Sequence, residues 1–214
     1  PHQDYVLLKL YPQGSTGINR FGPNGQLNPA VAIDQYDINV DPLLYEQPDG
    51  THWYHAHKHG STAIQILNGM AGALIVEGPF DTWLNDYYSN QGQTLTERLL
   101  VIQQISDILP MLVDRKAPGT AVPPGAPLVN GQGDPMLTMR PGEIQRWRIV
   151  NATMQASTQL LANLPKGFTV KQIAMDGIQF GPVNYADQPL QTTSAAGSPQ
   201  FTLSPGNRLD LLVQ

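Results

Sequence analysis

Cysteine is absent from this chain of 214 residues, and its absence excludes several kinds of site together. Without a thiol there is no disulfide, zinc thiolate site, iron–sulfur cluster or catalytic cysteine. A blue-copper centre is excluded on these residues as well, because it requires a cysteine thiolate. Cysteine usage therefore gives no information about the compartment in which the protein works.

Charged residues and long apolar runs are also scarce. Charged residues make up 14% of the chain, the formal net charge is −5, and no basic run occurs. The sequence therefore has no electrostatic footprint for nucleic acid, and we expect no nucleic-acid partner. No apolar stretch approaches the length of about 20 residues that a membrane-spanning helix needs, so we expect no membrane span. The first residue is proline and no signal peptide is visible, which indicates processing or truncation.

Turn-forming residues are plentiful by contrast, with 20 glycines and 19 prolines. Between them lie short segments of strand character, at 71–78, 98–106, 168–177 and 207–214, and a pair within 135–153 joined by a Pro141-Gly142 turn. Several short strands separated by turn signals favour an all-β protein, either a sandwich or a barrel. We expect these strands to be antiparallel.

The polar, turn-rich segment 81–97 predicts a linker between two domains. This divides the chain into residues 1–80, the linker at 81–97, and residues 98–214, the last forming the more complete sandwich. In the second domain Arg146 and Arg148 flank Trp147. Because side chains alternate along a strand, we interpret this triplet as ordinary packing, with the arginines on one face and the aromatic ring on the other.

Four of the five histidines fall within eight residues, in the segment DGTHWYHAHKHGST. Alternate side chains of an extended strand share a face, so His55, His57 and His59 are expected on one face and His52 on the other. Neutral imidazoles two residues apart can bind one metal ion or two adjacent ions, and they suit zinc, copper, iron and nickel. We therefore predict a metal site with His55 and His57 as ligands, and with His59 and His52 as neighbours or extra ligands.

The spacing alone leaves other metal proteins to consider. A cupin would carry a glutamate a few residues after its His-x-His motif, and no Asp or Glu occurs between Gly50 and Glu77. A mononuclear zinc or copper protein would need a third histidine, either His2 or His59. On the residues alone, this second alternative stays open.

At residues 50–78 the chain reads GTHWYHAHKHGSTAIQILNGMAGALIVEG. This segment resembles the end of the first domain of multicopper oxidases, the laccase and bilirubin-oxidase family, with its Gly-Thr-x-Trp-Tyr-His-x-His stretch and following apolar strand. Three later segments are similar, in order, to parts of the family's second domain: LVNGQGDPMLTMRPGEIQRWRIVNAT, IAMDGIQF and LSPGNRLDLLVQ. The resemblance covers residues 36–214.

This resemblance implies two cupredoxin-like Greek-key β-sandwich domains, the first incomplete. It implies that His55 and His57 ligate the type 3 pair of a trinuclear copper cluster. Enzymes of the family take single electrons from phenols, related aromatics or metal ions and reduce dioxygen to water. By the same resemblance the cofactor is copper, and the location is extracellular or periplasmic.

Parts of the family pattern are missing from the chain. Only His2 lies before residue 52, so the upstream His-x-His-Gly segment is absent. The last domain, with its His-Cys-His motif and type 1 copper, is absent as well. We therefore expect a portion of a multicopper oxidase, whose partners include the missing domains or another copy of the chain. A non-catalytic copper-binding or structural chain of the same fold is the alternative.

Overall fold

The computed structural model describes residues 10–11, 30–31, 48–57, 59–104, 127–154, 158–160, 168–181 and 201–214. Its strands are β1 (Leu10–Tyr11), β2 (Ala30–Val31), β3 (Gly50–His55), β4 (Ala71–Val76), β5 (Leu95–Gln104), β6 (Pro127–Val129), β7 (Ile144–Asn151), β8 (Thr158–Leu160), β9 (Val170–Met175), β10 (Ile178–Gln179), β11 (Phe201–Leu203) and β12 (Arg208–Val213). The helices of this part are α2 (Thr62–Leu67) and α3 (Pro79–Ser89). Strands therefore dominate, as expected from the sequence.

The largest sheet has six strands in the order β10-β9-β12-β7-β5-β6. Strand β12 pairs antiparallel with both β7 and β9, and β5 pairs antiparallel with β6. Strands β5 and β7, however, run parallel through eight residue pairs, from Leu95↔Ile144 to Ile102↔Asn151. The expectation of purely antiparallel strands is therefore wrong at the centre of this sheet. Strands β3 and β4 form a separate antiparallel pair, as do β8 with β11 and β1 with β2.

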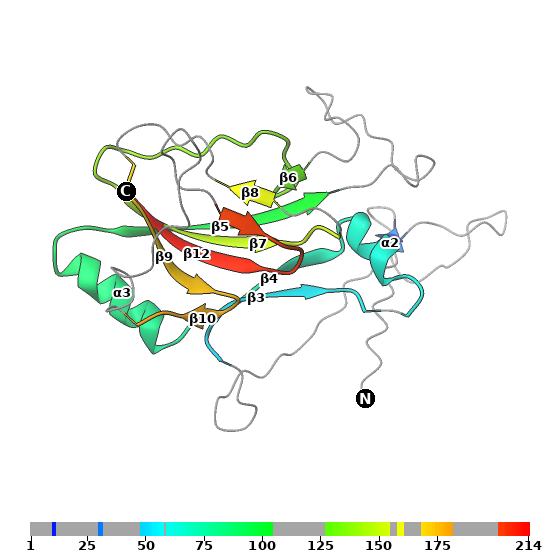
Figure 1. Ribbon diagram of the computed structural model, residues 1–214, viewed down its shortest axis with the longest axis horizontal. Helices are drawn as coiled ribbons and strands as arrows, with labels where there is room; N and C mark the ends of the chain where they lie inside the picture. Colours follow the sequence, from blue (N-terminus) through cyan, green and yellow to red (C-terminus); the bar gives the residue numbers. More distant parts are fainter. Residues whose placement is uncertain are drawn as a thin grey trace.

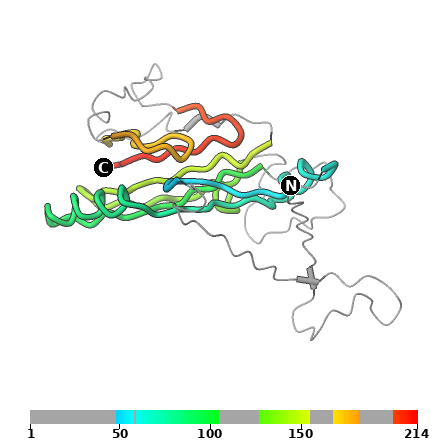
Figure 2. Tube along the Cα trace, turned by 90° about the horizontal axis from the view of Figure 1, so that it is seen from below, coloured from blue at the N-terminus to red at the C-terminus, as the bar shows by residue number. Residues whose placement is uncertain are grey.

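Two apolar clusters lie on opposite faces of the six-stranded sheet. One cluster joins Trp147 and Ile149 of β7 to Phe201 and Leu203 of β11. The other joins Leu84 of α3 to buried residues of three strands, which are Ile144, Ile173 and Leu212. Figure 2 shows β11 on one side of the sheet and α3 on the other. The sheet is therefore the middle layer of the molecule, and both of its faces are covered.

Every residue of β7 is buried, which fits a central strand covered on both faces. Trp147 lies in the cluster with β11, while Arg146 and Arg148 point to the face that α3 covers. The predicted alternation across this triplet is therefore correct. The interpretation as ordinary packing is incomplete, however, because both arginines are almost fully buried, at 1% and 0% exposure.

The segment 81–97, expected to be a linker, contains most of helix α3 and the beginning of β5. Gly78 precedes the helix, Pro79 occupies its first turn, and the Gly78 N–H donates to Asp81 Oδ2 at 2.8 Å. Proline and an N–H acceptor three residues after the cap both favour a helix start here. Leu84 is 1% exposed, so the helix is held by its buried face. Apart from Asp81, which is buried, the polar residues of this helix lie on its exposed face.

Most of the remaining strand predictions are confirmed by the structure, and one is wrong. The segments 71–78, 98–106, 168–177 and 207–214 correspond to β4, β5, β9 and β12, with residues after Gln104 lying outside the described part. Within 135–153 the second strand is β7, but residues 135–140 have no strand. The Pro141-Gly142 turn is present, with Gly142 at φ 78° and the Glu143 N–H donating to the Arg140 carbonyl at 3.0 Å.

Candidate metal centre

The histidine stretch begins on the hairpin formed by β3 and β4. The two strands pair from Gly50↔Val76 to His55↔Ala71. The expected strand through His59 is therefore too long, because β3 ends at His55. Beyond it the chain turns towards α2, and Gly60 in this turn has φ 81°, a conformation that glycine adopts without steric cost. Figure 1 shows this end of the hairpin beside α2, at the opposite end of the molecule from α3.

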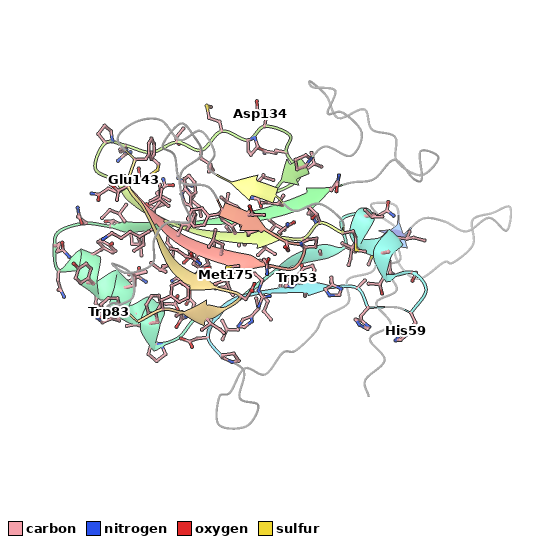
Figure 3. The ribbon with its side chains drawn as sticks, viewed as in Figure 1. Trp53, His59, Trp83, Asp134, Glu143 and Met175 are labelled. Carbon is pink, nitrogen blue, oxygen red and sulfur yellow. The ribbon has the colours of Figure 1, made fainter. Side chains whose placement is uncertain are left out.

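The rings of this stretch nevertheless follow one another in space. Ring centroids lie 4.6 Å apart between Trp53 and His55, 6.1 Å between His55 and His57, and 5.7 Å between His57 and His59. His55 is half-buried, whereas His57 and His59 are exposed. Figure 3 shows the run from Trp53, within the hairpin, to His59, at the outer turn. The structure thus brings together the three histidines that strand alternation groups.

A hydrogen bond fixes which nitrogen of His55 can bind a metal. His55 Nδ1 lies 2.9 Å from the carbonyl oxygen of Ala56. A carbonyl oxygen can only accept, so Nδ1 carries the proton and donates it. The lone pair of the neutral ring is then on Nε2. A backbone carbonyl that fixes the tautomer in this way is the usual support for a metal-binding imidazole.

His52 contacts Pro48 and Gly177. Its Nε2–H donates to the Pro48 carbonyl at 2.9 Å. Its ring packs against Gly177, where an added Cβ atom would lie 3.0 Å from His52 Cε1. Gly50, two residues before His52, also contacts Gly177, because a Cβ atom added at Gly50 would clash with the Gly177 carbonyl oxygen. His52 therefore belongs to the contact between the hairpin and the turn that joins β9 to β10.

The short helix α2 returns the chain from the histidines to β4. At its end the Gly69 N–H donates to the Ile66 carbonyl at 2.8 Å, and the Met70 N–H donates to the Gln65 carbonyl at 3.0 Å. Together with Gly69 at φ 86°, these bonds form a Schellman motif, which satisfies the last carbonyls of a helix. The start of β4 is therefore fixed relative to α2.

The start of β3 is fixed by charged residues that sequence reasoning missed. We call them the ion cluster, and its members are Asp81, Glu97, Arg146, Arg148 and Asp210. Arg148 Nη2 lies 2.6 Å from Asp81 Oδ1, and Arg146 Nη2 lies 2.8 Å from Asp210 Oδ2. The sequence does carry a signal for this cluster, since two arginines and one aspartate interrupt the buried strands IQRWRIVN and RLDLLV.

Thr51 joins the hairpin to the ion cluster. Its hydroxyl donates to Asp210 Oδ1 at 2.6 Å and accepts from Arg148 Nη1 at 3.1 Å. The residue is 0% exposed. Its backbone carbonyl accepts a further bond from Arg208 Nε at 3.2 Å. The strand that carries His55 is therefore anchored to the six-stranded sheet at its first residues.

The ion cluster shifts the pKa values of Asp81 and Arg148 in opposite directions. Burial alone would raise the pKa of Asp81, but the Gly78 N–H and the two arginines outweigh it and hold that pKa below its ordinary value of 3.8. Burial alone would lower the pKa of Arg148, and the carboxylates around it outweigh that effect and raise it. Both groups are therefore charged at neutral pH.

The ligand set at the histidines is partial. Among the residues that the structure describes, no group of three or more His, Cys, Asp or Glu side chains is placed to hold a metal ion. His55 and His57 offer imidazole nitrogens, the donor type that copper and zinc accept, but a metal held here needs further ligands. The described helices also include none long and apolar enough to cross a membrane.

Comparison with known proteins shows similarity to multicopper oxidases. The model of the multicopper oxidase family matches residues 30–80, the segment that contains the histidine stretch. The multicopper oxidase mco of Staphylococcus aureus is 32% identical over 133 residues, which is 62% of this chain and 28% of that protein. The chain is related to the multicopper oxidases. The iron transport multicopper oxidase fetC of Epichloe festucae is 26% identical over 173 residues, 79% of this chain and 25% of that protein.

A solved multicopper oxidase shares the fold. The crystal structure of McoA from Aquifex aeolicus superposes with a TM-score of 0.55 at 21% identity, covering 77% of this chain and 34% of that chain. The described part is thus an all-β, cupredoxin-like structure, as expected. This chain spans about a quarter of the length of the mco protein of Staphylococcus aureus and of the fetC protein of Epichloe festucae. Copper is the cofactor that this relationship implies.

Proposed function

We propose that this chain is part of a copper-dependent oxidoreductase of the multicopper oxidase type. Such an enzyme removes single electrons from phenols, related aromatics or metal ions and delivers them to dioxygen. Reduction of one dioxygen to water consumes four electrons and four protons, so four one-electron oxidations balance each turnover. A metal-ion substrate is supported by the name of the relative from Epichloe festucae, the iron transport multicopper oxidase fetC.

The observation that carries this proposal is the arrangement of His55 and His57. Their ring centroids are 6.1 Å apart, and the hydrogen bond from His55 Nδ1 to the Ala56 carbonyl leaves Nε2 as the ligand atom. Neutral imidazole is a ligand that suits copper. Both residues stand in the segment that the family model matches. We assign them as ligands of the type 3 copper pair.

The protein's part in this chemistry is to hold the imidazoles in place. Bound copper would supply the change in oxidation state that single-electron transfer requires. Trp53 packs 4.6 Å from His55, centroid to centroid, and limits how that ring can turn. His59, next in the run of rings, would serve as a neighbour of the ligands or an additional one, and His52 as a more distant support through its bond to Pro48.

The domain division and the location extend the same proposal. We propose residues 1–80 as part of a first cupredoxin domain, 81–97 as the connection, which contains most of α3, and 98–214 as a second domain. The location would be extracellular or periplasmic. The partners would be a phenolic or metal-ion substrate, dioxygen, and the missing domains or a second copy of the chain.

The test is copper uptake by the purified chain, measured by elemental analysis after removal of free metal. Replacing both ligands, as His55→Ala with His57→Ala, should abolish tight copper binding. The matched control is His52→Gln, whose amide can still donate to the Pro48 carbonyl and which should retain the copper. Circular dichroism checks that each variant keeps its strands. Unchanged copper content in the double variant would sink the assignment.

A second candidate function is a chain of the same fold that binds copper without turnover. The partial ligand set among the described residues favours it. It shares the copper-binding prediction, so copper content does not separate the two candidates. Oxygen consumption does, and that experiment is given below.

A further inference from the structure

We infer that Gln103 is a positioning residue for the histidine pair, an inference that rests on the proposed role of His55 and His57. Gln103 stands near the end of β5, in the six-stranded sheet, and not on the hairpin that carries the histidines. Its side-chain amide donates from Nε2 to the carbonyl oxygens of Gly69 at 3.1 Å and Ala71 at 3.2 Å. An amide NH₂ has two hydrogens, and each has an acceptor here.

One of these two acceptors, Ala71, lies directly opposite a proposed ligand, and Gly69 stands two residues before it. Ala71 is the register partner of His55 in the hairpin. Between the two carbonyls that Gln103 binds, Met70 directs its own carbonyl to the other side, where it accepts from the Ala56 N–H at 3.4 Å. Ala56 is the residue between the two proposed ligands. A short path of hydrogen bonds therefore leads from Gln103 through residues 69–71 to the backbone of the pair.

The base of this path is rigid. Gln103 is paired with Leu128 in the sheet, and its neighbour Ile102 is 2% exposed and paired with Asn151. On the other side, the Schellman motif at the end of α2 fixes Gly69 and Met70. The bond from the Ala56 N–H to the Met70 carbonyl is 3.4 Å long, which exceeds the usual range of about 2.7–3.2 Å, so it depends on Met70 being held in place.

Gln103 complements the anchor at Thr51. Thr51 ties the first residues of β3 to the ion cluster, four residues before His55. Gln103 ties the opposite end of the hairpin, where the ligands stand, to β5. Since β3 and β4 have only each other as strand partners among the described residues, side-chain bonds of this kind set how the hairpin lies on the sheet.

The test compares Gln103→Met with Gln103→Glu and with wild type in the full 214-residue chain. Both substitutions keep the side-chain length and remove the two donors at neutral pH. The matched control is Gln91→Met, because Gln91 also donates from Nε2 to a backbone carbonyl, that of Tyr87 at 3.2 Å, on an exposed part of the chain next to α3. The probe is copper(II) alone, titrated against a competing chelator.

Three readouts are expected to change together in the Gln103 variants. The dissociation constant for copper should rise about 10- to 100-fold, the range for loss of a group that orients a metal ligand. The electron paramagnetic resonance spectrum at full copper loading should change. In the metal-free chain, the amide hydrogen of Ala56 should exchange faster. Gln91→Met should leave all three readouts as in wild type.

The variant Leu84→Ala, which removes a core side chain on α3, distinguishes a general loss of stability from a specific effect on the copper site. That variant should lower the unfolding temperature without altering the copper spectrum. If wild type binds copper through His55 and His57 while the Gln103 variants keep its affinity, spectrum and Ala56 exchange, the inference is overturned and the proposed function stands. If the double histidine variant binds copper as wild type does, the proposed function fails and the inference fails with it.

Discussion

Asp81 connects the start of helix α3 to strand β7 through one carboxylate. Its Oδ2 accepts from the Gly78 N–H at the start of α3, and its Oδ1 accepts from Arg146 and Arg148 of β7. The residue is 5% exposed. Removing one partner from a buried ion pair leaves the others uncompensated, and this costs about 3–5 kcal/mol of unfolding free energy. The stability of this region therefore depends on Asp81 being ionised.

The first prediction concerns acid. Because the pKa of Asp81 is lower in the folded chain than its ordinary value of 3.8, the unfolded chain binds this proton more readily. The stabilisation is therefore complete above that ordinary value and is lost as the pH falls through the lower, folded pKa. We expect the urea midpoint of unfolding to fall steeply below about pH 4.

The variant Asp81→Asn provides the comparison. At neutral pH it should lower the unfolding free energy by about 3–5 kcal/mol, because both arginines lose a charged partner. Its midpoint should then decline less between pH 4 and pH 2 than that of wild type, since one titrating group is gone. Parallel acid profiles for the two proteins would show that Asp81 does not carry the effect.

Helix α3 and the β3–β4 hairpin cover the same face of the six-stranded sheet. Leu84 of α3 packs with Ile144, Ile173 and Leu212, and Thr51 of the hairpin contacts Asp210 on the neighbouring part of that face. The ion cluster lies between them and has members on α3, β5, β7 and β12. At the scale of elements, the helix therefore supports the surface on which the hairpin is anchored.

The second prediction tests whether α3 is a packed helix and not a flexible connection. Leu84→Ala should lower the unfolding free energy by about 2–5 kcal/mol, the range for truncating a buried leucine. Asn85→Ala, at the next and exposed position, should change it by less than about 0.5 kcal/mol. Urea unfolding of both variants measures the difference. Equal, small effects would mean that the helix does not pack as described.

The extent of the chain limits what it can do alone. It matches about a quarter of the mco protein and of the fetC protein. Among the residues that the structure describes, no group of three or more His, Cys, Asp or Glu side chains is placed to hold a metal ion. Reduction of dioxygen to water requires several copper ions held in fixed geometry. A misplacement of about 1 Å in such a constellation can cost about a hundredfold in rate.

The third prediction follows from that count of ligands. A protein made only of residues 1–214, loaded with copper, should not consume oxygen with a phenol at the rate of a typical enzyme, which is roughly 1–1000 per second. The measurement is oxygen uptake with an electrode, with and without the phenol. Supplying the missing upstream His-x-His-Gly segment and last domain should restore turnover. Full turnover by the chain alone would mean that a second copy completes the ligand set.

Several features were determined by the sequence itself. The apolar segments of β4, β5, β9 and β12 were predicted correctly as strands. A strand buried in a sheet has a local run of apolar residues with turn-forming residues at its ends, and this pattern is visible in the sequence. The crowding of histidines into eight residues indicated a metal site. The surrounding motif indicated a resemblance to multicopper oxidases, and the comparisons confirm this resemblance. The ligand roles of His55 and His57 stay a prediction.

Other features were decided only by tertiary structure. Residues 81–97 are polar enough to suggest a linker, and the packing of Leu84 against Ile144, Ile173 and Leu212 is what holds most of α3 within this segment. The ion cluster joins residues up to 67 positions apart within one pair, and Gln103 lies 32 positions from Ala71. Local periodicity reports which face of a strand is buried, but it does not report which distant group meets that face. Long-range contacts of this kind exist only once the chain is folded, and here they hold the hairpin that carries the histidines.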